Sequence, residues 1–158
     1  MITIRFATAE DVPLILRFIR SLAAYEHLSP EVEATEERLR CTLFPQDGQP
    51  AAECLLAFWD GHPAGFAVIF QNYSTFLAKP GLYLEDLFVE PAQRGRGLGK
   101  ALLLHCARLA NTRGCGRMEW SVLDWNEPAR GFYRKLGAGE MTAWRICRLA
   151  GPALQQYA

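Results

Sequence analysis

The sequence predicts an α/β fold in which a mixed sheet carries helices on both faces. Short runs that alternate or stay apolar predict strands, and longer runs with apolar residues at helical spacing lie between them. Their order, β-α-α-β-β-β-α-β-α-β-β, is neither a simple alternation nor a segregated set. At 158 residues, with 50% hydrophobic and 22% charged residues, the chain suits a single domain spanning residues 1–158.

The first ninety residues predict one strand, two helices and three further strands. Residues 2–6 alternate like a short strand, and residues 12–25 have helical spacing. Ser29 before Pro30 predicts the N-cap of a second helix that runs to about residue 44. Asp60 and Gly61 predict a hairpin turn between strands at 54–58 and 64–70, and residues 82–89 supply the next strand.

The remaining residues predict two helices and further strands. Residues 98–113 form the longer helix and residues 118–122 a strand. Pro128 opens a short helix that runs to Lys135, and Gly137 ends it. Residues 141–149 are expected to supply the last strands.

A glycine-rich turn joins the strand at 82–89 to the helix that begins at residue 98. The first amides of a helix lack intrahelical partners and its dipole is positive there, so a phosphate is the natural ligand. The P-loop pattern fails at Arg94 and Ala101, and the dinucleotide fingerprint fails at Lys100. The pattern [QR]-x-x-G-x-[GA] is satisfied by Arg94, Gly97 and Gly99. A plain tight connection is the alternative for a lone glycine motif, so its context must decide.

A second motif follows about 30 residues later, in Trp-Asn-Glu-Pro at residues 125–128 and Phe-Tyr at 132–133. In that order, the two motifs resemble the acyl-CoA pyrophosphate loop and the CoA-crossing segment of the GCN5-related N-acetyltransferase (GNAT) superfamily. The runs Tyr-Leu-Glu-Asp-Leu-Phe-Val at 83–89 and Ala-Tyr-Glu at 24–26 further resemble its diamine acetyltransferase branch, which includes spermidine/spermine and thialysine N-acetyltransferases. The resemblance extends from residue 4 to about residue 149.

The resemblance implies a mostly antiparallel sheet, splayed at the acyl-CoA site, and a homodimer. It implies transfer of acetyl from acetyl-CoA to a primary amine of a small cationic substrate. The residues implied in cofactor binding are Phe88, Val89, Arg94, Gly95, Arg96, Gly97, Leu98, Gly99, Lys100, Asn126 and Tyr133. Those implied in substrate binding are Glu26, Glu85, Asp86 and Trp144.

Two side chains are the candidates for proton transfer. By its position and the resemblance, Glu85 is the candidate base. It acts directly or through water, because a carboxylate with a pKa of roughly 4 is a weak base unless burial or a neighbouring acid raises that pKa. As neighbours on a strand, Glu85 and Asp86 point to opposite faces unless a bulge intervenes. Tyr133 is the candidate acid, because a phenol with a pKa of about 10 stays protonated at neutral pH. The alternative for Glu85 is a surface or salt-bridged acid, and the alternative for Tyr133 is a core aromatic side chain.

Substrate choice is predicted from departures from the polyamine-accepting members. Those members have an acidic residue where Ser74 falls, a tryptophan where Phe76 falls, and acids where Thr142 and Ala143 precede Trp144. Each lost carboxylate removes a partner for a distal ammonium, so a diamine or a thialysine- or lysine-like amino acid is favoured over a polyamine. A protein or peptide N-acetyltransferase and a non-catalytic acyl-CoA-binding module are the alternatives.

Charge is distributed unevenly along a chain of zero net charge. Residues 1–90 carry 6 basic and 13 acidic side chains, a net charge of −7, and the rest carry 11 basic and 4 acidic ones, a net charge of +7. This polarity suits an anionic cofactor and a cationic substrate. Nucleic-acid binding is not expected, because the sequence has no stripe of basic residues interleaved with aromatic ones. The scattered cysteines and histidines predict no metal site, and the absence of a long apolar run or signal-like start predicts a cytoplasmic location without membrane contact.

Overall fold

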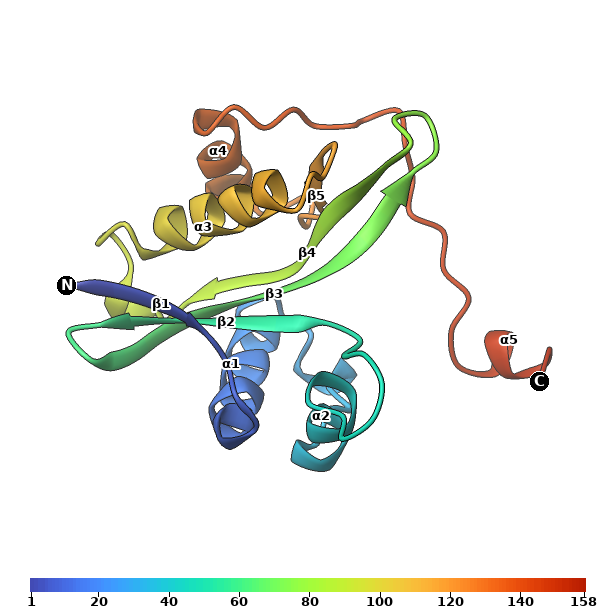
Figure 1. Ribbon diagram of the computed structural model, residues 1–158, viewed down its shortest axis with the longest axis horizontal. Coiled ribbons are helices and arrows are strands. Elements are labelled where there is room, and N and C mark those ends of the chain that lie inside the picture. The colour runs from blue at the N-terminus through green and yellow to red at the C-terminus, as the bar shows by residue number, and fades with distance from the viewer. The chain divides into compact units, whose positions relative to one another are not determined.

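A five-stranded sheet in the order β1-β2-β3-β4-β5 organises the first of two units (Figure 1). The computed structural model describes residues 1–158, which divide into Met1–Ser121 and Val122–Ala158. All neighbouring strands are antiparallel except β4 and β5, which are parallel, so the predicted mixed, mostly antiparallel sheet is confirmed. The strands are β1 (Ile2–Phe6), β2 (Glu53–Trp59), β3 (His62–Ser74), β4 (Lys79–Val89) and β5 (Met118–Trp120).

Helices cover both faces of this sheet, as predicted. The helices α1 (Val12–Tyr25) and α2 (Glu36–Leu43) lie on one face, and α3 (Leu98–Thr112) lies on the other (Figure 1). The α3 helix buries Leu98, Leu102, Cys106 and Ala110, which recur every four residues and therefore form one stripe. No helix of the chain is both long enough and apolar enough to span a bilayer.

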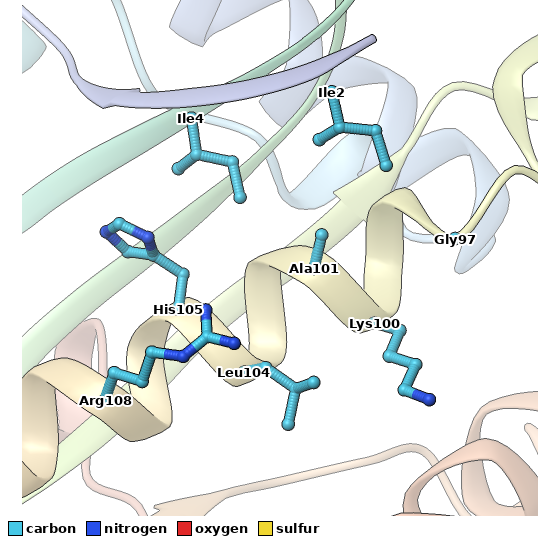
Figure 2. Close-up of a pocket in the computed structure, with 8 residues that line it drawn as sticks. All are labelled: Ile2, Ile4, Gly97, Lys100, Ala101, Leu104, His105 and Arg108. Carbon is cyan, nitrogen blue, oxygen red and sulfur yellow. The ribbon is translucent and has the colours of Figure 1, made fainter.

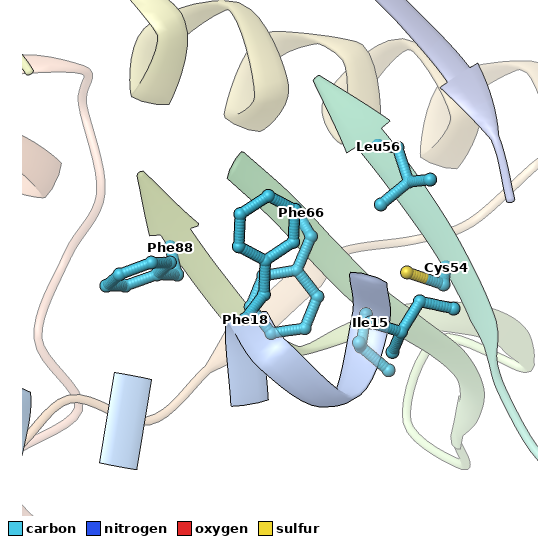
Figure 3. Close-up of a cluster of buried hydrophobic side chains, with 7 residues drawn as sticks. Ile15, Phe18, Cys54, Leu56, Phe66 and Phe88 are labelled. Carbon is cyan, nitrogen blue, oxygen red and sulfur yellow. The ribbon is translucent and has the colours of Figure 1, made fainter. Parts of the chain in front are cut away.

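An aromatic cluster fixes α1 on β3 and β4. Phe18 of α1 lies with its ring centroid 5.5 Å from that of Phe66 and 6.2 Å from that of Phe88, and Ile15 completes the contact with the sheet (Figure 3). Burying each of these side chains contributes about 1.5–3 kcal/mol, and each ring pair adds about 0.5–1.5 kcal/mol. The end of β4 is thereby held against α1.

The second helix begins later than the sequence predicted. Ser29–Glu31 form only a 3-10 turn, η2, after which Val32 is extended. The α2 helix begins at Glu36 because Thr35 caps it, its hydroxyl accepting a hydrogen bond from the Arg38 amide at 3.2 Å. The predicted start at Ser29 was therefore wrong, although a helix does end at Leu43.

The second unit contains α4 (Glu127–Lys135) and α5 (Pro152–Gln155). The predicted cap and stop of α4 are confirmed: the Asn126 side-chain oxygen accepts a hydrogen bond from the Ala129 amide at 3.3 Å, and Gly137 has a φ of +92°. The strands predicted at 141–149 were wrong, because these residues pair with no neighbouring strand edge. Their apolar side chains, Trp144 and Ile146 among them, are exposed.

Gly65 of β3 permits a close approach to the end of β4. A Cβ atom at this position would lie 2.4 Å from the Phe88 carbonyl oxygen, a backbone atom that cannot move independently. We predict that Gly65→Ala lowers the free energy of unfolding by about 2 kcal/mol, measured by chemical denaturation. Gly139→Ala is the matched control, since no atom lies within 4 Å of the added Cβ there. Equal stability of the two variants would contradict this packing.

Candidate active site

A β-bulge in β4 determines which side chains share a face of the sheet. Val68 of β3 pairs with Asp86, but the next residue, Ile69, pairs with Leu84, so Glu85 is an extra residue without a cross-strand partner. Tyr83 packs on Phe70, with ring centroids 5.0 Å apart, which places it on the α1 face of the sheet.

The bulge brings two neighbouring carboxylates to the α1 face. Glu85 follows Tyr83 by two residues and keeps that face by alternation. Asp86 shares the face because it pairs with Val68, a member of the core cluster under α1. The condition attached to the sequence prediction is therefore met: a bulge intervenes, and the two carboxylates do not point to opposite faces.

A third carboxylate, Glu26 at the end of α1, lies close enough to Asp86 to affect its ionisation. Burial, together with the negative charges of Glu85 and Glu26, raises the pKa of Asp86 to about 7. Burial also raises the pKa of Glu26. The structure thus brings together three of the four predicted substrate-binding residues, as a cluster of negative charge that suits an ammonium ion.

The position of Glu26 is fixed by how α1 ends. The His27 amide donates to the Ala24 carbonyl at 3.2 Å and the Leu28 amide donates to the Ala23 carbonyl at 2.8 Å, which together form a Schellman motif. His27 occupies the left-handed position, with a φ of 60°, where glycine is usual. The chain therefore turns sharply directly after Glu26.

The glycine turn presents the N-terminus of α3 to a ligand. Gly95 and Gly97 have φ values of +77° and +83°, a conformation that other residues rarely adopt. The Ala101 amide makes a 2.9 Å hydrogen bond to the Gly97 carbonyl, so the preceding amides of the first turn lack intrahelical partners. No heavy atom lies within 4 Å of a Cβ placed on Gly95 or Gly97. The turn is therefore open, and pyrophosphate binding by Leu98, Gly99 and Lys100 stays a prediction.

The arginines of the turn pack on aromatic rings. The Arg94 guanidinium lies 4.6 Å from the ring centroid of Tyr25, and its Nε donates to the Val89 carbonyl at 3.0 Å. The Arg96 guanidinium lies 5.2 Å from the ring centroid of Trp59. The sequence indicated only their charge. Their aromatic partners are distant in sequence, so no local sequence pattern predicts the contacts.

The end of β4 has a strand neighbour on one side only. Pairing with β5 stops at Leu84, whereas β3 accompanies β4 as far as Val89. Residues 85–89 therefore present an open edge, where the backbone near Phe88 and Val89 is predicted to hold the carbonyl oxygen of the acetyl group. The Phe88 side chain is buried in the core, so its backbone is the part that a ligand can reach.

A groove of about 500 Å³ begins at Gly97 and runs between α3 and β1 (Figure 2). Ile2 and Ile4 point into it from β1, and His105 and Arg108 reach it from α3 (Figure 2). It lies on the α3 face of the sheet, opposite the face of the carboxylates, so it is separate from the acidic cluster.

Three predicted site residues belong to the second unit. Asn126 caps α4, Tyr133 lies on α4 with its ring centroid 5.3 Å from that of Phe132, and Trp144 lies in the exposed segment after it. Arg130 and Arg134 both bind Glu140, which ties α4 to the chain that follows it. The roles of these three residues at the cofactor and the amine stay predictions. No group of three His, Cys, Asp or Glu side chains is arranged to hold a metal ion.

The fold and the glycine turn agree with a match over residues 19–138 to the model of the Acetyltransferase (GNAT) family. The chain belongs to this family, and it is an acetyl-CoA-dependent N-acetyltransferase.

Relatives of known activity are similar over nearly the whole chain. A thialysine N-epsilon-acetyltransferase of Bos taurus is 36% identical, covering 99% of this chain and 97% of its own. An L-ornithine N5-acetyltransferase of Arabidopsis thaliana is 35% identical, covering 96% and 86%. An integron cassette protein from the mobile metagenome of V. cholerae superimposes with a TM-score of 0.79 at 25% identity, over 99% of this chain and 96% of that one.

The raised pKa of Asp86 predicts a pH-dependent stability. In the unfolded chain its pKa returns to about 4, whereas in the folded protein it is about 7. The folded state therefore binds this proton more tightly, and the free energy of unfolding falls as the pH rises from about 4 to about 7. A shift of this size corresponds to roughly 4 kcal/mol when complete, and partial exposure of Asp86 reduces the expected loss to about 2 kcal/mol.

Asp86→Asn should remove this loss. Denaturant unfolding at pH 4, 6 and 8 should show the wild type losing about 2 kcal/mol relative to the variant. Asp47→Asn, in an exposed loop, is the control and should follow the wild type. Parallel pH curves for Asp86→Asn and the wild type would show that the carboxyl titrates normally.

Proposed function

We propose that the enzyme transfers acetyl from acetyl-CoA to a primary amine of a small cationic substrate, a diamine or an amino acid of the thialysine, lysine or ornithine type. The observation that carries this proposal is the acidic cluster formed by Glu26, at the end of α1, with Glu85 and Asp86 of β4, the strand that leads into the glycine turn. The activities of the thialysine and ornithine acetyltransferase relatives support it. Donor and acceptor would thus meet at the end of β4.

Acetyl-CoA supplies the acetyl group as a thioester. The protein must remove a proton from the ammonium group of the amine and donate a proton to the departing thiolate. Glu85 takes the proton of the incoming ammonium, directly or through water, because it stands at the bulge beside the open edge of β4. Asp86, with its pKa of about 7, is partly protonated near neutral pH. A bound ammonium favours its ionised form, so Asp86 serves to hold the amine. Tyr133 donates a proton to the departing thiolate.

The positions that differ from the polyamine-accepting members support a shorter amine. Ser74 is buried, and its hydroxyl accepts a hydrogen bond from the Leu77 amide at 3.2 Å, so it holds the turn between β3 and β4. Phe76, at that turn, is 94% exposed. Neither position supplies a carboxylate for a distal ammonium. The homodimeric state and the cytoplasmic location implied earlier stay predictions.

A CoA-release assay with acetyl-CoA and a panel of amines tests the proposed function. We expect turnover with thialysine, L-ornithine, L-lysine or a short diamine at a kcat/KM at least about tenfold above that for spermidine. Loss of one ammonium contact of about 1–2 kcal/mol accounts for such a factor. A preference for basic peptides would favour the protein acetyltransferase. Acetyl-CoA binding without turnover of any amine would favour the regulatory module.

Tyr133→Phe tests the assignment of the acid. Removing a positioned general acid costs about a hundredfold or more in rate, so kcat should fall by this factor while the KM for acetyl-CoA changes little. Tyr157→Phe, at an exposed position, is the control and should leave kcat unchanged. A normal kcat in Tyr133→Phe would exclude Tyr133 as the acid.

A further inference from the structure

Arg94 spans the distance between the glycine turn and the end of α1. Its guanidinium carbon lies 4.6 Å from the ring centroid of Tyr25 and 5.8 Å from that of Phe88, and its Nε donates to the Val89 carbonyl at 3.0 Å. One side chain thereby contacts the last residue of α1 and the last two residues of β4. It forms no salt bridge, so these contacts are stacking and a single hydrogen bond.

Of the three acidic residues, Glu26 is the one that the sheet does not hold in place. Glu85 and Asp86 belong to β4 and are fixed by its pairing with β3. Glu26 follows the last residue of α1, and His27 after it holds a left-handed conformation that costs about 1 kcal/mol or more for a non-glycine residue. A strained turn of this kind persists only when surrounding contacts support it. The Arg94 contact with Tyr25 provides such support one residue away from Glu26.

The other arginine of the turn provides a natural comparison. Arg96 also stacks on an aromatic ring, but its partner Trp59 ends β2 and pairs with Ile2 and His62 rather than with α1. Both arginines carry the same charge close to the predicted pyrophosphate site. Only Arg94 is connected to the residues that would bind the amine.

We propose that Arg94 is a positioning residue of the amine site: by stacking on Tyr25 it fixes Glu26 against β4, and it joins the acetyl-CoA turn to the site of the acceptor. The proposal rests on the proposed function for the identity of the amine. As a consequence, a substitution of Arg94, which lies in the acetyl-CoA turn, should weaken binding of the amine.

Steady-state kinetics with L-ornithine or thialysine, whichever the wild type turns over faster, test this role in Arg94→Lys and Arg94→Met. Lysine keeps the charge that a phosphate attracts but loses the planar stacking and the hydrogen bond to Val89. We expect the KM for the amine to rise roughly three- to tenfold in both variants, the size of one exposed cation–π contact with one hydrogen bond. The KM for acetyl-CoA should rise in Arg94→Met alone.

Arg17→Lys is the matched control, since the Arg17 guanidinium also stacks on an aromatic ring, 5.2 Å from the ring centroid of Phe18, and it should leave the KM for the amine within about twofold of the wild type. Tyr25→Leu removes the stacking alone, so it should raise that KM no more than Arg94→Lys does, and the double variant should match Arg94→Lys because the stacking is then already lost. An unchanged KM for the amine in Arg94→Lys would overturn the proposal.

Amide hydrogen exchange separates this claim from the proposed function. The amides of Glu26, His27 and Leu28 close the end of α1, and they should exchange about three- to tenfold faster in Arg94→Lys but not in Arg96→Lys. Unchanged exchange would overturn the positioning role, even if the KM for the amine rises, since Arg94 would then act on the amine itself. Failure of the wild type to acetylate any amine would refute the proposed function, whereas the exchange result would still decide whether Arg94 holds α1.

Discussion

A single extra residue in β4 changes which face of the sheet the following residues occupy. Before the bulge, Leu82 and Leu84 face α3; after it, Asp86 and Phe88 face α1. Without the extra residue, the even-numbered positions would stay on the α3 face and Asp86 would point away from Glu26. The bulge at Glu85 therefore allows three carboxylates to meet, and it also carries Phe88 into the aromatic core that fixes α1.

In the proposed function, the strand β4 contributes to the binding of both the acetyl donor and the amine acceptor. Its last residues are paired on the β3 side and open on the other, and the chain then passes through the glycine turn to the first amides of α3. Positive partial charge at the helix start suits the anionic donor, while the carboxylates on the α1 face suit the cationic acceptor. The acidic first half of the sequence thus supplies the carboxylates on β4 and α1, and the basic second half supplies the turn that directly follows β4.

Features that depend on local chemistry could be predicted from the sequence, and those that depend on distant partners could not. The cap of α4 at Asn126 and its stop at Gly137 follow from a few adjacent residues, and both are observed. The bulge depends on the register between β3 and β4, which alternation alone does not specify. The stacking of Arg94 on Tyr25 joins residues far apart in sequence.

The two wrong predictions have the same kind of cause. A serine and a proline at 29–30 resemble a helix start, but the cap at Thr35 competes better because it satisfies the Arg38 amide. Residues 141–149 have the apolar content of strands, yet a strand forms only where a neighbouring edge satisfies its backbone groups. The prediction that Glu26, Glu85 and Asp86 belong to the site came from family resemblance and not from a local pattern.

The measurement that tests the central claim most directly is an NMR titration of the Asp86 carboxyl carbon in the wild type, Glu85→Gln and Glu26→Gln. If the bulge gathers the three carboxylates on one face, Asp86 titrates with a pKa of about 7 in the wild type and at a lower pH in each variant, because each substitution removes a neighbouring negative charge. A pKa close to the ordinary value of about 4, unaffected by either substitution, would contradict the account.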